Sequence, residues 1–381
     1  MKRNLLAIAI PALLVAGTAS ASIEVWNKDG NKVDFYGRVY ALNYITDRDN
    51  QTGEGDKTTA RLGMSGQTQV TENITGYGRW EYEAKTGSDA ENETRYAYAG
   101  MNFGDLGSFD YGRNDGVLKT LTSYTDVLPE FGGDASDNDL YALSARTKAV
   151  ATYRNSDFFG LVNGLRFAVQ YADNGDNSST SYFNKHDRDG HDSAEAWGSV
   201  VDWDVLDTGL SIGAGYAQTG GHKDAKAWSA GVKYDNNNLY LAALYIQGKQ
   251  KYGWENTLTT HSTDDLKTKG YEVVAQYGID FDIGRLTPSV AYIQHRVQDA
   301  SSYSRSGDAG LKGNDLIKYV DVGLTYDFNK NLQAILDYKI NLLDKDDIGA
   351  RRALYGDSKF GGSQIKATTK DTVALGLIYQ F

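Results

Sequence analysis

The chain ends in Thr372-Val373-Ala374-Leu375-Gly376-Leu377-Ile378-Tyr379-Gln380-Phe381, and this stretch decides the fold class. Large apolar side chains occupy every second position from Val373 to Phe381. Alternation with a period of two is typical of a β-strand, because successive side chains point to opposite faces of the strand. The stretch therefore predicts a strand with one continuous apolar face.

The same alternation recurs along the rest of the chain. It is first seen over 33–41, which predicts that both ends of the chain are strands. Further segments with an apolar face lie at 74–82, 165–171, 210–216, 228–234, 271–277, 320–326 and 332–340. We count about sixteen segments, often with aromatic residues at the ends of the apolar face. This pattern predicts an all-β protein, a transmembrane antiparallel β-barrel of about sixteen strands.

The composition agrees with a barrel better than with an average soluble domain. The 381 residues include 27 tyrosines and 42 glycines but only 3 prolines and no cysteine, so no disulfide holds the fold together. The mean hydropathy is negative, which by itself indicates a soluble protein. In a membrane barrel, however, every second residue faces a polar lumen and dilutes the apolar signal.

The first residues have the pattern of a secretory signal peptide. Lys2 and Arg3 precede an apolar run over 5–15 and the small residues Ala19-Ser20-Ala21. A retained membrane helix is the weaker alternative, because the run is too short to span a bilayer. We expect residues 1–21 to be removed and residues 22–381 to form a single barrel domain.

The net charge is negative, which argues against nucleic acid as a partner. It is −11 for the whole chain, and becomes −13 once Lys2 and Arg3 are removed with the signal peptide. An acidic exported chain is a poor candidate for nucleic-acid binding.

The connections between the segments fall into two classes. Short turns rich in Asn and Asp are predicted at Asp235–Asn238 and Asp327–Asn331. Long polar connections are predicted at 46–57, 174–195, 249–269, 298–315 and 344–370. Short turns at one end and long loops at the other are expected of an outer-membrane barrel. A soluble β-sandwich is not expected to separate short and long connections in this way.

One stretch, Tyr124-Thr125-Asp126-Val127-Leu128-Pro129-Glu130-Phe131-Gly132-Gly133-Asp134, breaks the alternation. Pro129 fixes its own φ and favours an extended conformation at the preceding residue, whereas Gly132 and Gly133 permit positive φ. The stretch predicts a loop of defined shape that carries two acids, Asp126 and Glu130.

Arginines on the polar faces of predicted strands are a second sign of a water-filled interior. Arg38, Arg61 and Arg95 lie in such segments. An arginine facing lipid at mid-bilayer costs roughly 2–4 kcal/mol, so these side chains need water or a partner. They are either scattered lumen charges with no specific role or one side of a charged opening that faces Asp126 and Glu130.

At this loop the sequence resembles a known family, the general diffusion porins of the enterobacterial outer membrane, including osmoporin-like members. The resemblance covers the mature chain and rests on motifs in the same order. These motifs are Glu24-Val25-Trp26-Asn27-Lys28-Asp29-Gly30-Asn31-Lys32, Phe109-Asp110-Tyr111-Gly112-Arg113-Asn114, Tyr124–Asp134, Ala151-Thr152-Tyr153-Arg154-Asn155 and Tyr379-Gln380-Phe381.

The resemblance implies sixteen strands, a homotrimer and a third loop folded into the lumen to form a constriction. Asp126 and Glu130 would be the acidic half of that constriction. Its basic half would be Arg38, Arg61, Arg95 and Arg146, with Lys148 as a rival for the last position. Arg113 would contact the second loop of a neighbouring subunit, although that loop, 84–93, is short here.

The sequence therefore predicts a channel in the cell outer membrane, exported through the periplasm, for passive passage of small hydrophilic solutes and ions. No enzymatic activity, cofactor or metal is expected, and the expected partners are outer-membrane lipids, lipopolysaccharide and other subunits. Between Glu130 and Arg146 there is no basic residue, while Asp134, Asp137 and Asp139 follow the loop. This charge pattern predicts a weak preference for cations.

Several alternatives remain open at this point. A sugar-specific channel needs an aromatic track along the lumen, and the tyrosines fall on both predicted faces. An adhesin or phage receptor would use the same long loops. A barrel enzyme would need a catalytic Ser/His/Asp group, and none stands out. The run His186–Asp192 fails as a calcium loop, because the EF-hand frame puts Lys185 first and Ala196 twelfth.

Overall fold

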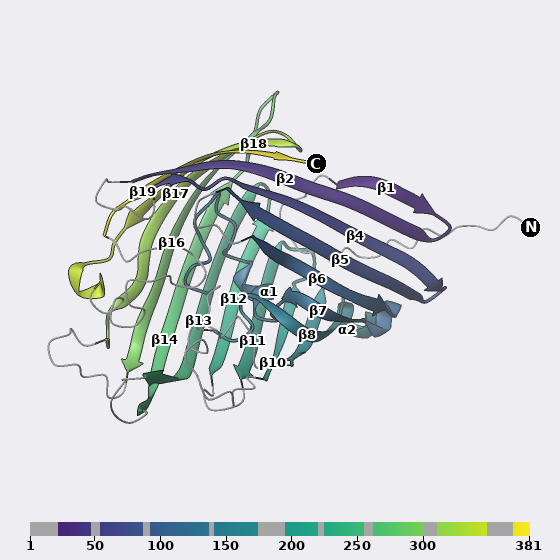
Figure 1. Cartoon of the computed structure of the whole chain (residues 1–381), viewed down its shortest axis with the longest axis horizontal. Helices are drawn as coiled ribbons and strands as arrows, with labels where there is room; N and C mark the ends of the chain where they lie inside the picture. Colours follow the sequence, from purple (N-terminus) through teal and green to yellow (C-terminus); the bar gives the residue numbers. More distant parts are fainter. Residues whose placement is uncertain are drawn as a thin grey trace, which may run out of the picture.

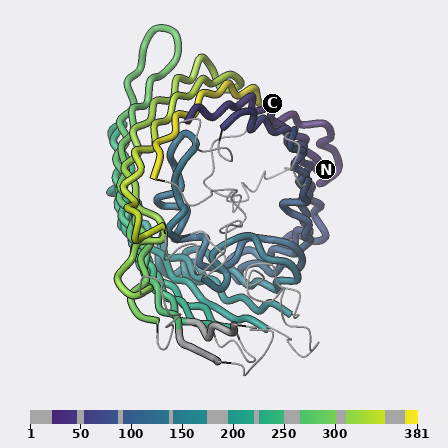
Figure 2. The backbone as a smooth tube through the Cα atoms, turned by 60° about the vertical axis from the view of Figure 1, so that its left-hand side comes forward, coloured from purple at the N-terminus to yellow at the C-terminus, as the bar shows by residue number. Residues whose placement is uncertain are grey.

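The protein is a closed antiparallel β-barrel of sixteen long strands (Figures 1 and 2). The computed structural model describes residues 22–46, 54–86, 92–136, 141–173, 195–219, 225–254, 262–300, 311–348 and 369–381. The predicted signal peptide, the run His186–Asp192, and Asp137 and Asp139 lie outside these residues. The all-β class and the predicted strand number are confirmed.

Each long strand pairs with the next one along the chain, and the last pairs with the first. The strands are β2 (Asn31–Thr46), β4 (Thr59–Thr71), β5 (Ile74–Lys85), β6 (Glu93–Asn102), β7 (Ser108–Asp115), β8 (Arg146–Asn155), β9 (Leu165–Ala172), β10 (Ala196–Asp204), β11 (Leu210–Thr219), β12 (Lys226–Asn236), β13 (Leu239–Trp254), β14 (Ser262–Tyr277), β16 (Arg285–Ala300), β17 (Asp315–Asn329), β18 (Leu332–Asn341) and β19 (Thr372–Gln380).

Both ends of the chain pair with one edge of β2. The N-terminal strand β1 (Ser22–Lys28) pairs with Asn31–Tyr36, and β19 pairs with Arg38–Thr46. Between them, the backbone N–H of Gly37 donates to the Phe381 carbonyl at 2.9 Å, and the N–H of Phe381 donates back at 3.0 Å. The prediction that both chain ends are strands is confirmed, and together they form one composite edge.

The remaining elements are short. Two-residue strands, β3 (Gly55–Asp56) and β15 (Ile279–Asp280), extend the sheet beside β2 and β16. The helices of the described chain include η1 (Gly104–Leu106), α1 (Lys119–Thr122) and α2 (Asp157–Gly160). No helix in the described ranges is long and apolar enough to cross a membrane.

The alternation in the sequence separates the two faces of the sheet. In β19, Leu375, Leu377 and Tyr379 are each about half exposed, whereas Ala374 and Gln380 are buried. The exposed apolar face is the outward one, since a closed barrel in a membrane presents this face to lipid. The opposite face carries buried charged residues, including Glu81, Glu83, Asp110, Asp202, Glu272, Asp321 and Asp337.

The turn predictions are confirmed for one end of the barrel. Asn237 and Asn238 connect β12 to β13 with φ of 53° and 64°, the left-handed conformation that asparagine tolerates well. The predicted connection at 249–269 is wrong in its bounds, because β13 and β14 continue in register to the pair Trp254 and Ser262. Beyond the lipid both faces of a strand meet water, so the strand continues without the apolar alternation used to find it.

An arginine on the outward face tests the assignment of the two faces. Val273 lies on the outward face of β14, between Tyr271 and Tyr277, and is 53% exposed. We expect Val273→Arg to reduce the free energy of unfolding in lipid vesicles by roughly 2–4 kcal/mol. Gln247→Arg, on the same face but two residues beyond Tyr245 toward the connection between β13 and β14, should change it by about 1 kcal/mol or less. Denaturant titrations compare the two variants, and equal effects would contradict the assignment.

Candidate functional site

The connection between β7 and β8, residues 116–145, is called the third loop below. It contains α1 and the stretch that breaks the alternation in the sequence. Gly132 and Gly133 both have positive φ, 139° and 65°, as predicted. Pro129 lies against Gly323 of β17, where an added Cβ would come within 2.7 Å of the proline ring. The loop therefore has a defined shape, and its proline packs closely against β17.

Two carboxylates on the polar face of the sheet hold this loop by its backbone and hydroxyl groups. Asp337 of β18 accepts hydrogen bonds from the N–H groups of Glu130 (2.9 Å) and Phe131 (3.0 Å). On β14, Glu272 is only 1% exposed and accepts from the N–H of Ala135 at 3.0 Å. Hydroxyl groups from the same loop complete the Glu272 site: Thr125 and Ser136.

Glycines on the polar face leave room for the third loop. At each of these positions an added Cβ would come within 3.2 Å of a loop atom. They lie on β10 to β14: Gly198, Gly213, Gly215, Gly231, Gly248 and Gly270. The loop thus packs closely along five neighbouring strands, and larger residues there would displace it.

The two acids of the third loop have different surroundings. Glu130 accepts hydrogen bonds from the hydroxyls of Tyr40 (2.7 Å) and Tyr44, both on β2. Burial raises the pKa of Glu130, and these tyrosines and Arg38 act against that rise. Asp126 is more exposed, with 45% of its side chain accessible, and lies 3.5 Å from the ammonium of Lys119.

Arg38 and Arg61 lie directly opposite each other on β2 and β4. Like charges in this position repel, so they need an acidic neighbour. Glu83 of β5 supplies it, because it lies opposite Arg61 and forms an ion pair with it. The Arg38 guanidinium lies 5.3 Å from the centre of the Tyr40 ring, and Tyr40 in turn donates its hydroxyl hydrogen to Glu130.

Arg95 of β6 shares one carboxylate with an arginine that the sequence analysis did not select. Glu81 accepts from Arg95 at 2.6 Å and from Arg79 at 2.7 Å. The Arg79 guanidinium also lies 4.2 Å from the centre of the Tyr96 ring, a geometry that favours a cation–π interaction. Arg79 is therefore fixed on two sides within the same group of charges.

Arg146 and Arg113 approach the carboxylate of Glu93, at 3.5 Å and 3.4 Å. Of the two rival positions Arg146 and Lys148, Arg146 is the one that reaches these charges, and Lys148 is exposed. Arg113 thus has a partner within its own chain. We call the six arginines of this region the arginine cluster: Arg38, Arg61, Arg79, Arg95, Arg113 and Arg146.

Three glutamates that pair with the arginine cluster were not selected in the sequence analysis. For two of them the sequence did contain an indication. Glu81 and Glu83 alternate with apolar residues in β5, on the same face as Arg79. Two acids and an arginine at successive polar positions indicate ion pairs with neighbouring strands. Glu93 lies at the first residue of β6, where the alternation gives no guidance.

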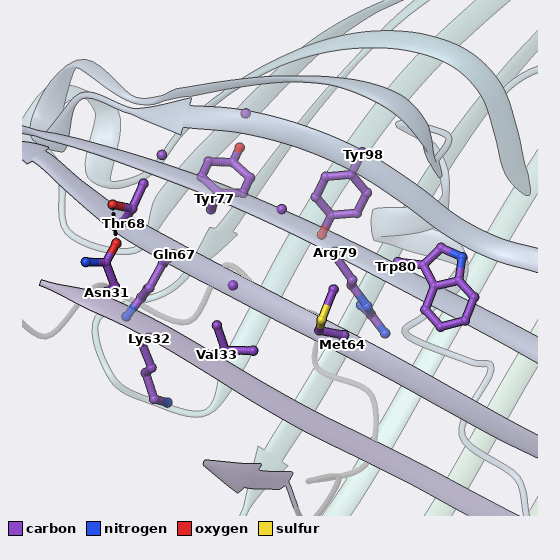
Figure 3. A pocket seen from close by; sticks show the side chains of 14 residues that line it. Asn31, Lys32, Val33, Met64, Gln67, Thr68, Tyr77, Arg79, Trp80 and Tyr98 are labelled. Carbon is purple, nitrogen blue, oxygen red and sulfur yellow. Dashed lines mark hydrogen bonds between the residues drawn. The ribbon is translucent and has the colours of Figure 1, made fainter. Parts of the chain in front are cut away.

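A cavity of about 590 Å³ lies beside the arginine cluster, over β2, β4, β5 and β6 (Figure 3). Four of the lining residues are glycines, which carry no side chain to fill the space: Gly66, Gly76, Gly78 and Gly100. Residues from both faces of the sheet line it. Met64 and Trp80 belong to the apolar face, while Tyr77, Arg79 and Tyr98 belong to the polar one.

Comparison with known proteins places this architecture in a family. The family model described as Gram-negative porin matches residues 28–381. The chain is 44% identical to outer membrane porin N of Escherichia coli (strain K12) over 404 residues, and 44% identical to outer membrane porin C of Enterobacter cloacae over 402 residues. Both comparisons cover 100% of each chain.

A solved structure agrees with the sequence comparisons. The structure described as Salmonella typhi OmpF complex with Daunomycin superposes with a TM-score of 0.71 at 33% identity, covering 94% of this chain and 100% of that one. The relatives are channels of the outer membrane rather than enzymes, and the same holds for this protein. The chain belongs to the Gram-negative porin family.

Proposed function

We propose that this outer-membrane channel selects small hydrophilic solutes at a constriction between the third loop and the arginine cluster. The observation that carries the proposal is the hydrogen bonding of the loop to Glu272 and Asp337, on the polar face of β14 and β18. The polar face of a closed membrane barrel borders its lumen, so these contacts support a loop that folds inward. Solutes would pass down their gradients without any chemical step.

The charges support a field across the opening. The arginine cluster lies on β2 and β4 to β8, whereas Asp126 and Glu130 belong to a loop held from β14 and β18. Opposed charges at a narrow point orient polar solutes and disfavour bulky apolar ones. Asp126, Glu130, Arg38, Arg61, Arg95 and Arg146 are the residues that we propose for this filter, with Arg79 added.

We propose that the channel weakly prefers cations. Four of the proposed filter residues are arginines and two are acids, and this count taken alone would favour anions. Glu81, Glu83 and Glu93 pair with arginines of the cluster and offset part of its positive charge. Asp134, which follows the loop acids, adds negative charge beside Lys339, at 3.4 Å.

A sugar-specific channel is less well supported than a general one. Its aromatic track would need free ring faces along the lumen. Arg79 lies against the rings of Tyr36 (5.3 Å) and Tyr96 (4.2 Å), and Tyr77 meets Tyr98 edge to face. These rings are engaged with neighbours rather than aligned for stacking. A role as adhesin or phage receptor would lie in the long loops and remains an additional hypothesis.

We also propose that the protein acts as a homotrimer in contact with outer-membrane lipids and lipopolysaccharide, after removal of residues 1–21 on export. Members of the Gram-negative porin family form trimers, which supports the first part. Contact of Arg113 with a neighbouring subunit stays a prediction, since within one chain it pairs with Glu93.

Planar-bilayer recording tests the channel and its filter together. We expect large, ungated, roughly ohmic conductance steps in groups of three, with a reversal potential in a salt gradient that shows weak cation preference. Asp126→Asn with Glu130→Gln removes two negative charges and should shift the preference toward anions, whereas the matched control Asp282→Asn with Glu72→Gln, at exposed positions, should not. Folded protein without conductance would refute the channel, and an unchanged reversal potential would refute only the filter.

The raised pKa of Glu130 predicts how selectivity depends on pH. Because this pKa lies above the usual value, about 4.3 for glutamate, Glu130 takes up a proton at a higher pH than an ordinary glutamate. Cation preference should therefore decline as the pH falls, beginning above the usual glutamate range. Reversal potentials of Glu130→Gln should lack this step, and an identical pH profile in the variant would contradict the assignment.

Glu272 is predicted to position the third loop. Glu272→Ala removes the acceptor for the Ala135 N–H, and a buried donor left without a partner costs roughly 1–3 kcal/mol. Hydrogen exchange at the Ala135 amide should accelerate about tenfold or more, and open-channel current noise should rise. Glu72→Ala, in an exposed turn, is the matched control. Unchanged exchange at Ala135 would show that other contacts suffice to hold the loop.

A further inference from the structure

Three arginines approach the carboxylate of Glu93, the first residue of β6. The guanidinium of Arg113 comes within 3.4 Å of it, that of Arg146 within 3.5 Å and that of Arg95 within 3.9 Å. They belong to three neighbouring strands, β6, β7 and β8. Guanidinium groups that converge on one point are the arrangement by which proteins recognise carboxylates and phosphates. Here a carboxylate of the chain itself lies at that point.

Glu93 is held less firmly than the other two glutamates that pair with the arginine cluster. Its side chain is 32% exposed, whereas those of Glu81 and Glu83 are 6% and 5% exposed. The ion pairs of Glu81 have N–O distances of 2.6 Å and 2.7 Å, but those of Glu93 are 3.4 Å to 3.9 Å long. Long ion pairs of a partly exposed carboxylate contribute little, so another anion can take its place.

The arginines around Glu93 are ready to accept such an anion. The ring of Tyr96, which is 6% exposed, lies 6.0 Å from the Arg146 guanidinium, and the Tyr96 hydroxyl donates to Asp115 at 3.0 Å. Arg146 therefore packs against a fixed aromatic ring. The Nε of Arg113 is buried and has no hydrogen-bond acceptor within the described ranges. This donor is available to an anion with more acceptor oxygens than a carboxylate.

The sheet is irregular at two of these arginines. The pairing of β5 with β6 shifts by one residue, which leaves Arg95 without an opposite residue. The pairing of β7 with β8 shifts between Gly112 and Asn114, the neighbours of Arg113. Bulges of this kind redirect side chains and are common beside functional sites. Both shifts therefore help to direct guanidinium groups from different strands toward one point.

We propose that Glu93 is a tethered occupant of an anion subsite, formed by Arg95, Arg113 and Arg146, which otherwise takes solutes carrying a phosphate group. A phosphate monoester brings about two negative charges and three acceptor oxygens, and so satisfies three guanidinium groups better than one carboxylate does. While Glu93 fills the subsite, the channel disfavours such solutes, which makes Glu93 a specificity-determining residue. The inference rests on the proposed function, because solutes reach the subsite through the lumen.

The test measures how strongly a phosphorylated solute blocks the potassium chloride current of single channels in planar bilayers. The probe is glycerol 2-phosphate at about pH 8, where the phosphate carries about two charges, and glycerol is the uncharged reference. Glu93→Gln removes the tethered carboxylate. Glu72→Gln makes the same change of charge in an exposed turn and is the matched control.

We expect Glu93→Gln to bind glycerol 2-phosphate roughly tenfold more tightly than the unmodified protein, because the tethered carboxylate no longer competes with the phosphate or repels it. Its reversal potential in a salt gradient should also shift toward anions. Glu72→Gln should leave both quantities unchanged. Arg113→Gln should cancel the gain when combined with Glu93→Gln, but should leave the affinity nearly unchanged on its own, since Glu93 already fills the subsite.

Equal affinity of Glu93→Gln and Glu72→Gln for the probe would overturn the inference, and so would a block by glycerol as strong as that by its phosphate. Weaker binding in Arg113→Gln alone would show that the subsite is already open in the unmodified protein. That measurement needs no substitution of Glu93, so it tests the inference even if Glu93→Gln fails to refold. All these results leave the channel itself intact, whereas folded protein without conductance would count against the proposed function.

Discussion

The structure depends on one constraint: within a membrane, every backbone N–H and C=O group must find a partner inside the protein. A sheet meets this condition only when it has no free edge, and β2 removes the edge by pairing with β4 on one side and with β19 and β1 on the other. Closure leaves two faces, one toward lipid and one toward water, and the side chains are sorted accordingly. Charged side chains can be present within this membrane protein because the second face exists.

The carboxylates of the polar face serve two different purposes. Glu81, Glu83 and Glu93 accept from arginines and allow several guanidinium groups to lie close together. Glu272 and Asp337 instead accept from the third loop, whose own backbone has no strand to pair with there. In the proposed constriction, the net field would therefore depend on the acids of the wall as well as on the two acids of the loop. A count of arginines alone therefore leaves out the carboxylates that offset their charge.

Much of the fold could be predicted from the sequence, because a period of two is a direct consequence of having lipid on one side and water on the other. Leu375 and Leu377 in β19 show this clearly. The loop was predicted on other grounds, from residue types that fix or permit special backbone angles, and Gly132 and Gly133 do have positive φ. The ends of β13 and β14 could not be predicted, since a strand surrounded by water needs no alternation. The partners of Arg95 and Glu130 could not be predicted either. Which side chains meet depends on the register between strands, and the sequence of one strand does not determine that register.

The shared edge of β2 has a consequence for the order of assembly. The pairs between β2 and β19 join residues more than three hundred positions apart, so no partial chain can make them. Until β19 is present, the part of β2 from Arg38 to Thr46 keeps unpaired backbone groups on this edge, a template on which other chains can add. Contacts that distant also form slowly, since the loop they close is the whole protein. The barrel can therefore close only after β19 has been made, because the closing pairs are spread over Thr372–Gln380 at the end of the chain.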